Sequence, residues 1–280
     1  MKMSKFIKST LILLVGGFLT KVLGMLIKII TTRIIGTETL GLYMLIMPTF
    51  NLFITLAQGG LPISVSKIVS ENKKDNKKIV FSSIFISICT TFFLMILLIF
   101  ISPLIAKFLH NDSLSFPIMC IGLTLPFISL SGIIRGYFFG KENMFPHVLS
   151  NNFEQVVRII LNIIFLPLLS NYEPRVSVTF LILSNVISET TSIIILYFFL
   201  PRKIKVTKEM LKPEKIIIKD VLNISIPTTG SRIIGTIGYF LEPIVLTSFL
   251  LMNGYTTNYI TYEYGVLTGY VMPLLLLPSF

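Results

Sequence analysis

Long apolar runs alternate with short polar segments along the whole chain. Each run reaches or exceeds the about 20 residues that an α-helix needs to cross the ~30 Å hydrocarbon core of a bilayer. The pattern predicts spans at residues 10–34, 40–66, 79–106, 114–138, 147–169, 176–200, 218–250 and 259–280. Prolines such as Pro48, Pro126 and Pro227 fall inside spans, where neighbouring helices can satisfy the freed carbonyl groups. We therefore expect an all-α membrane protein, a multi-pass helical bundle of eight spans.

Lysine and arginine are unequally divided between the two ends of these spans. Three precede the first span, five follow the second, two (Arg135 and Lys141) lie between the fourth and fifth, and seven follow the sixth. The opposite end has only three, which are Arg33, Lys107 and Arg175. Positively charged loops remain in the cytoplasm. The asymmetry predicts a protein of the cell membrane with a cytoplasmic N-terminus.

The composition supports the same interpretation. Of the 280 residues, 53% are hydrophobic and 13% are charged, and the mean hydropathy is +0.84. Soluble domains carry about 25% charged residues, so this chain has too little polar surface for a water-soluble globule. The net charge of +11 lies in short runs between spans rather than in a recognition helix or an aromatic platform, so we expect no nucleic-acid partner.

Residues capable of catalysis are sparse and scattered. Cys89 and Cys120 lie far apart in apolar runs, and His110 and His147 have no adjacent nucleophile. Paired carboxylates, a glycine-rich phosphate loop and metal-ligand spacing are all missing from the sequence. We expect no enzymatic activity, no cofactor and no metal.

The first span has a counterpart six spans later. Thr20-Lys21-Val22-Leu23-Gly24 matches Ser231-Arg232-Ile233-Ile234-Gly235 by residue class, and in the helices that follow, Gly41 precedes Pro48 as Gly265 precedes Pro273. Such repeats are typical of transporters that hold the substrate between two halves. We expect residues 1–205 to form a complete six-helix lobe and 206–280 to begin a second. Because 274–280 lie within an apolar run, we interpret the chain as truncated, with a possible separately encoded C-terminal half.

Apart from the cations counted at the ends of the spans, four lie inside the predicted spans: Lys21, Lys28, Arg158 and Arg232. A cation at the centre of a lone helix costs at least about 2.5–3.5 kcal/mol, so these side chains should face protein or a water-filled cavity. Polar residues share their helix faces or lie on neighbouring helices, and we take four amides as further candidates, namely Asn51, Gln58, Gln155 and Asn162.

Acidic residues leave alternatives open. Glu154, one turn before Arg158, can form a buried pair that neutralises itself. Glu189 and Glu242 can carry a proton or pair with a cation on another helix. Lys28 can also extend along the helix to the outer interface.

Several segments carry a resemblance to a known family, in the family's order along the chain. They are the segment 33–67 with Gly59-Gly60-Leu61-Pro62-Ile63, then Arg135-Gly136-Tyr137-Phe138-Phe139-Gly140, Asn143-Met144-Phe145-Pro146, Glu154-Gln155-Val156-Val157-Arg158, Ile224-Ser225-Ile226-Pro227, Leu241-Glu242 and Tyr264-Gly265-Val266-Leu267-Thr268-Gly269. The chain resembles the stage V sporulation protein B-like polysaccharide flippases of the multidrug/oligosaccharidyl-lipid/polysaccharide (MOP) exporter superfamily.

The resemblance implies a MATE-like fold of two six-helix lobes and alternating access between them. It implies that the substrate is a lipid-linked sugar diphosphate, such as a peptidoglycan or polysaccharide precursor, in spore cortex or cell-wall synthesis. The four intramembrane cations suit the phosphates, and the four amides suit the sugars. Lipid II flippases of the superfamily tend to carry extra charges near the second-helix glycine, where Leu52, Phe53 and Gln58 stand here, so the identity of the sugar stays open.

Two other functions compete with the flippase. A cation-coupled multidrug exporter on the same scaffold would need unpaired acids, for which Glu154, Glu189 and Glu242 are the candidates. Alternatively, the truncated chain is a non-functional remnant, because alternating access needs both lobes.

Overall fold

The computed structural model describes residues 5–73, 75–201 and 214–275, and within these ranges the chain is helical, without strands. The elements are α1 (Lys5–Gln58), α2 (Leu61–Glu71), α3 (Asn76–Phe108), the 3-10 helix η1 (Asp112–Leu114), α4 (Ser115–Gly140), α5 (Phe145–Leu169), α6 (Pro174–Phe199), α7 (Lys215–Met252), α8 (Thr257–Val266), the π-helical segment η2 (Leu267–Val271) and α9 (Met272–Leu275). The predicted all-α, multi-pass bundle is confirmed.

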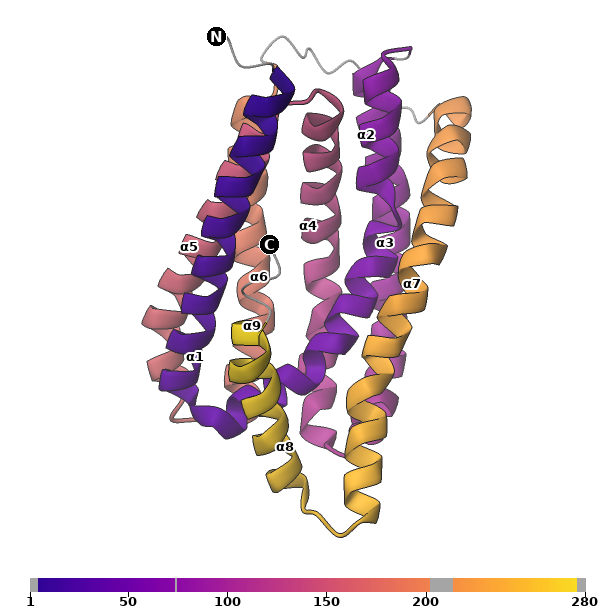
Figure 1. Ribbon diagram of the computed structural model, residues 1–280. Helices are drawn as coiled ribbons and strands as arrows, with labels where there is room; N and C mark the ends of the chain where they lie inside the picture. Colours follow the sequence, from indigo (N-terminus) through magenta and orange to yellow (C-terminus); the bar gives the residue numbers. More distant parts are fainter. Residues whose placement is uncertain (1–4, 74, 202–213, 276–280) are drawn as a thin grey trace.

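α1 contains two spans. Gly36 lies inside it with φ 75° and ψ 169°, a backbone conformation that favours glycine, and the chain reverses direction there (Figure 1). The predicted separation of 10–34 from 40–66 is therefore confirmed. Among the described residues, six helices are long and apolar enough to cross a membrane, and the first of these, Ile7–Glu71, holds both spans.

The predicted eighth span, 259–280, corresponds to α8, η2 and α9 as far as Leu275, and its last five residues lie outside the described part of the chain. It is not among the six apolar helices. The predicted lobe boundary at 205 also lies outside the described residues.

One predicted span is interrupted. The prediction of a single helix over 40–66 is wrong because Gly59 (φ 49°) and Gly60 (φ 65°) separate α1 from α2. The Ser129 hydroxyl of α4 donates to the carbonyl oxygen of Ala57 at 3.1 Å, so it satisfies an acceptor that the break leaves without its usual helical donor. A cavity of about 370 Å³ lies beside the break, lined mostly by apolar atoms and by the hydroxyl-bearing Thr90, Ser225 and Thr229.

Side-chain contacts between segments that are distant in sequence show which helix ends lie at the same end of the bundle. At one end, Ser9 donates to the Glu142 carbonyl, Lys141 to Asn72, and Lys78 pairs with Glu214. At the other end His110 lies 3.1 Å from Ser248. Within the described residues, the helix ends next to the turns that were assigned to one side by charge thus lie together at one end of the bundle (Figure 1).

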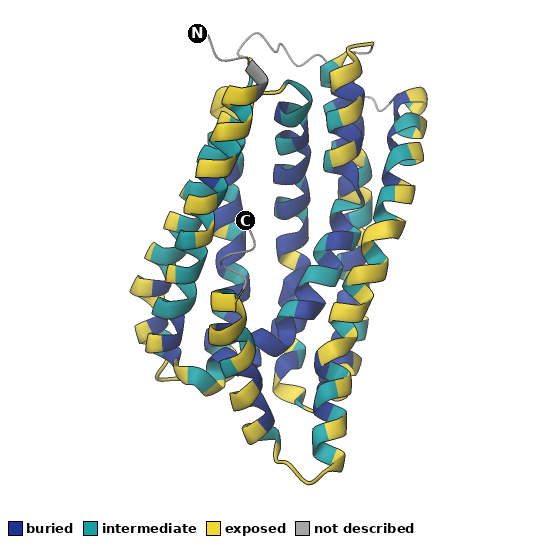
Figure 2. Ribbon diagram, viewed as in Figure 1, coloured by how far each residue is buried: buried dark blue, intermediate teal, exposed yellow. Residues whose placement is uncertain are grey.

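α4 is the most buried span (Figure 2). It packs against α2, α3 and α6, whereas α5 packs against α1 and α6. The helices after residue 205 lie on this bundle, with α7 against α1, α2 and α3, and α8 against α1. The first six spans therefore pack together, α8 joins them through α1, and α7 joins them through α1, α2 and α3.

Candidate functional site

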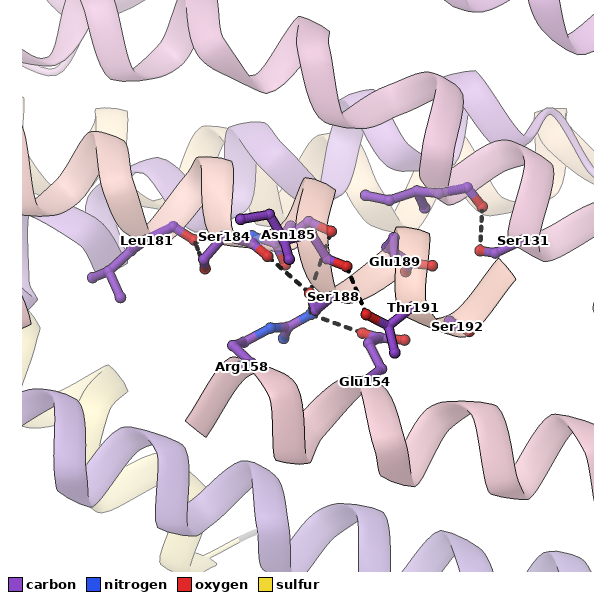
Figure 3. Close-up of polar contacts among 12 residues, drawn as sticks. Ser131, Glu154, Arg158, Leu181, Ser184, Asn185, Ser188, Glu189, Thr191 and Ser192 are labelled. Atoms are coloured by element: carbon purple, nitrogen blue, oxygen red, sulfur yellow. Dashed lines mark hydrogen bonds and ion pairs between the residues drawn. The ribbon is translucent and has the colours of Figure 1, made fainter. Parts of the chain in front are cut away.

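A cluster of four charged side chains joins α4, α5 and α6. Arg135 donates to Glu154 Oε2 at 2.9 Å, and the guanidinium lies 3.5 Å from Glu189 Oε2. Arg158 donates to Glu154 Oε1 at 2.7 Å. Serine hydroxyls of α6 complete the cluster, with Ser192 2.8 Å from Arg135 and Ser188 3.4 Å from Arg158. Figure 3 shows Arg158 extending toward Glu154 and Ser188.

The assignment of Arg135 to a cytoplasmic loop is wrong. α4 continues to Gly140, so the Arg135 side chain is only 16% exposed and faces two carboxylates. The hydropathy pattern places Arg135 inside the predicted span 114–138. The count of loop cations nevertheless assigns it to the loop that follows, so the correct position could have been taken from hydropathy. With two arginines and two glutamates within reach of each other, the cluster is balanced in charge.

Lys21 and Lys28 lie on a different face of α1 from the one that packs on α5. Thr20 donates to Asn152 at 2.8 Å, and a methyl group at Gly16 would overlap Val148, so Gly16 and Thr20 form the packed face. Lys21 is exposed. A methyl group at Gly24 would meet no described atom within 4 Å. This open face continues to Lys28, whose ammonium donates to the backbone carbonyl of Thr268 at 3.3 Å.

The repeat-related segment of α7 is arranged in the same way. Arg232 is exposed, and Gly235 has open space where a side chain would be. The neighbouring Thr236 faces α1, where its hydroxyl lies 3.5 Å from that of Thr55. Glu242, two turns further, is exposed and lies near Tyr239 and Tyr264.

The candidate amides are divided between packing and partly open positions. Asn162 is fully buried and donates to Thr31 of α1 at 2.9 Å. Gln58 is partly buried, next to Gly132 of α4. Asn51 and Gln155 are partly buried. The structure therefore does not bring all candidate site residues to one surface.

α1 and α8 cross at two glycines that the sequence repeat relates. A methyl group at Gly41 would overlap the carbonyl oxygen of Thr261, and one at Gly265 would lie 2.9 Å from that of Thr37. Thr261 follows Thr37 by the same number of residues as Gly265 follows Gly41. Reciprocal contacts of this kind are what a two-fold relation between helix pairs produces.

Comparison with known proteins agrees with this architecture. The sequence profile of the family described as "Polysaccharide biosynthesis protein" matches residues 6–280. The chain is 37% identical to stage V sporulation protein B of Bacillus subtilis (strain 168), over 98% of this chain and 55% of that protein. It is 27% identical to lipid II flippase MurJ of the same organism, over 56% of this chain and 31% of that protein.

A solved structure shares the fold. An inward-facing MATE family multidrug resistance transporter of the MOP superfamily superposes with a TM-score of 0.69 at 18% identity, covering 92% of this chain and 60% of that one. The chain thus spans about half the length of the first curated relative and three fifths of the solved transporter.

Proposed function

Because the chain belongs to the polysaccharide biosynthesis protein family of multi-pass membrane proteins, we propose that it is part of a flippase for a lipid-linked sugar diphosphate. In this proposal the substrate moves across the cytoplasmic membrane by alternating access between two lobes, residues 1–205 and a lobe that begins at 206. The transporting unit includes the part of the relatives that lies beyond the match, supplied by a separately encoded half or a longer chain. The N-terminus lies in the cytoplasm.

One observation carries the choice of an anionic substrate. Lys28 lies within a span and its ammonium contacts a neutral carbonyl, and among the described residues it has no ion-pair partner. An intramembrane cation that is not neutralised by the protein marks a substrate or ion pathway. Lys21 lies seven residues earlier on the same face, about 10 Å away along the helix. Together they suit a diphosphate, whose charge is spread over several oxygens.

The surroundings of the other candidate residues suggest which of them bind the phosphates, which bind the sugar and which only stabilise the first lobe. Arg232, exposed on α7, is the matching cation of the second lobe. Asn51, Gln58 and Gln155, all partly buried, are the proposed sugar contacts. Arg158 and Asn162, which are held by neighbours on α5, α6 and α1, support the shape of the first lobe.

The rival function, export of organic cations, has less support. Such a site needs carboxylates that are available to the cargo. Arg135 lies within ion-pair distance of both Glu154 and Glu189, and Arg158 also binds Glu154. Glu242 is the remaining candidate acid, and it is exposed on α7 beside two tyrosines.

The test is a hybrid flippase in which this chain replaces the matching part of the sporulation relative. In cells that lack that relative, the hybrid should clear accumulated lipid-linked precursor, and Lys21→Ala with Lys28→Ala should restore the accumulation. Lys107→Ala, an exposed cation in the last turn of α3, is the matched control. Efflux of a fluorescent cation that survives Lys21→Ala and Arg232→Ala but is lost in Glu189→Gln would instead establish the exporter.

A further inference from the structure

The helical hydrogen bonding of the α8–α9 region leaves one carbonyl without a backbone donor. In η2 the Met272 N–H donates to Leu267, five residues back, instead of to Thr268, four residues back. A five-residue pattern would give Thr268 the N–H of residue 273, but residue 273 is proline and has no N–H. The carbonyl of Thr268 is therefore available to a side chain, and the Lys28 ammonium occupies it at 3.3 Å.

Both partners of this contact are departures from the repeat. Tyr239 follows Arg232 as Lys28 follows Lys21, so the second lobe has no cation at the matching position. The glycine-to-proline spacing is one residue longer in Gly265–Pro273 than in Gly41–Pro48. π-helical turns accommodate one inserted residue and are frequent at functional sites. The glycine contacts of Gly41 and Gly265 occur in both helix pairs, whereas the hydrogen bond from Lys28 to Thr268 has no counterpart in the repeat.

A diphosphate would compete for this lysine on favourable terms. The ammonium is partly buried and its one contacted acceptor among the described residues is a neutral carbonyl, whereas a diphosphate would add the attraction between opposite charges to the hydrogen bond. Lys21 lies on the same face about 10 Å away, so an anion bound between the two lysines would draw Lys28 off the carbonyl.

We propose that the contact between Lys28 and the Thr268 carbonyl is a latch that fastens η2, and with it the adjoining α8, to α1 and that a bound diphosphate releases. The identity of the anion rests on the proposed function, but the latch itself does not. Release of α8 by the substrate would link occupancy of the first lobe to movement of the second. A ligand shifts a conformational equilibrium only through different affinities for the two states, and the freed ammonium supplies that difference.

Hydrogen–deuterium exchange of the 280-residue chain in lipid nanodiscs tests the latch without transport. In Lys28→Met, peptides covering 264–275 should exchange about tenfold faster than in the original chain, which corresponds to ~1.4 kcal/mol. Lys28→Arg should exchange like the original chain, because it retains a cationic donor. Lys107→Met is the control, and unchanged exchange in α4 shows that each variant is folded. Unchanged exchange of 264–275 in a folded Lys28→Met, or equally fast exchange in Lys28→Arg, would overturn the latch.

Inorganic pyrophosphate is the probe for release. At equal ionic strength set with chloride, it should accelerate exchange of 264–275 in the original chain to the Lys28→Met rate and leave Lys28→Met unchanged. No acceleration, or the same acceleration in both chains, would refute release through Lys28. A latch that responds while the hybrid fails to clear precursor would disprove the flippase alone, and the reverse result would disprove the latch alone.

Discussion

Charge balance decides what the buried side chains of α4, α5 and α6 can bind. Arg135 and Arg158 share Glu154, and Arg135 also faces Glu189. Burial of ions is tolerated when attraction and hydrogen bonds offset their lost hydration, and serine hydroxyls supply further bonds here. Because its two arginines already pair with glutamates, the cluster offers an anionic substrate little excess positive charge, although the Nε atoms of Arg135 and Arg158 have no hydrogen-bond partner among the described residues. Lys28 of α1, by contrast, contacts a neutral backbone carbonyl.

Arg135→Met should destabilise the bundle strongly because it leaves two carboxylates buried with less positive charge. Breaking a buried pair costs about 3–5 kcal/mol. Arg175→Met is the matched control, since Arg175 also pairs with a glutamate, at 2.6 Å, but both side chains are more than half exposed. Exposed pairs contribute about 0–1 kcal/mol. Unfolding transitions in detergent measure both variants, and equal shifts would show that the cluster is not stabilising.

The sequence allowed half of this cluster to be predicted. Glu154 and Arg158 are four residues apart on one helix, so local geometry alone brings them together. Arg135 reaches Glu154 and Glu189 only when three helices pack. Without partners on other helices, a cation near the end of an apolar run is more favourable in a loop. The ion pairs of Arg135 with Glu154 and Glu189 make its position inside α4 favourable instead.

At the scale of helices, hydropathy predicted where spans occur but not where they break. An apolar run reports length and composition, whereas the break at Gly59–Gly60 and the π-helical turn of η2 are changes in hydrogen bonding. Both changes leave acceptors that distant residues satisfy, Ser129 for Ala57 and Lys28 for Thr268. Such partners cannot be identified from one segment at a time.

Gly41→Ala should weaken the crossing of α1 and α8, since the added methyl group would overlap the Thr261 carbonyl. Overpacking of a close contact typically costs about 1–3 kcal/mol. Gly24→Ala is the matched control in the same helix, because open space surrounds that position. The measured quantity is the midpoint of thermal unfolding in detergent. If both variants had the same midpoint, the crossing would not contribute to stability.

For the whole molecule, the glycine crossing gives the proposed two lobes a common axis. The first helix pair offers Thr37 and Gly41, the second offers Thr261 and Gly265, and each glycine packs on the other pair's threonine. In the proposed two-lobe arrangement, Lys21 lies on the span before Gly41 and Arg232 lies on the span before Gly265. A diphosphate between the lobes could then be approached by a cation from each side.

Orientation in the membrane determines the direction in which such a unit works, and it can be tested by labelling single cysteines. The described ends of the basic turns lie at one end of the bundle, so the positive-inside rule predicts that this end faces the cytoplasm. With Cys89 and Cys120 replaced by serine, Tyr172→Cys and Asn253→Cys at the opposite end should react with an impermeant maleimide on intact cells. Lys73→Cys and Glu142→Cys should react only after permeabilisation, since all four positions are in turns or at exposed helix ends. Labelling of Lys73→Cys on intact cells would show the inverted orientation, in which the basic turns face outward.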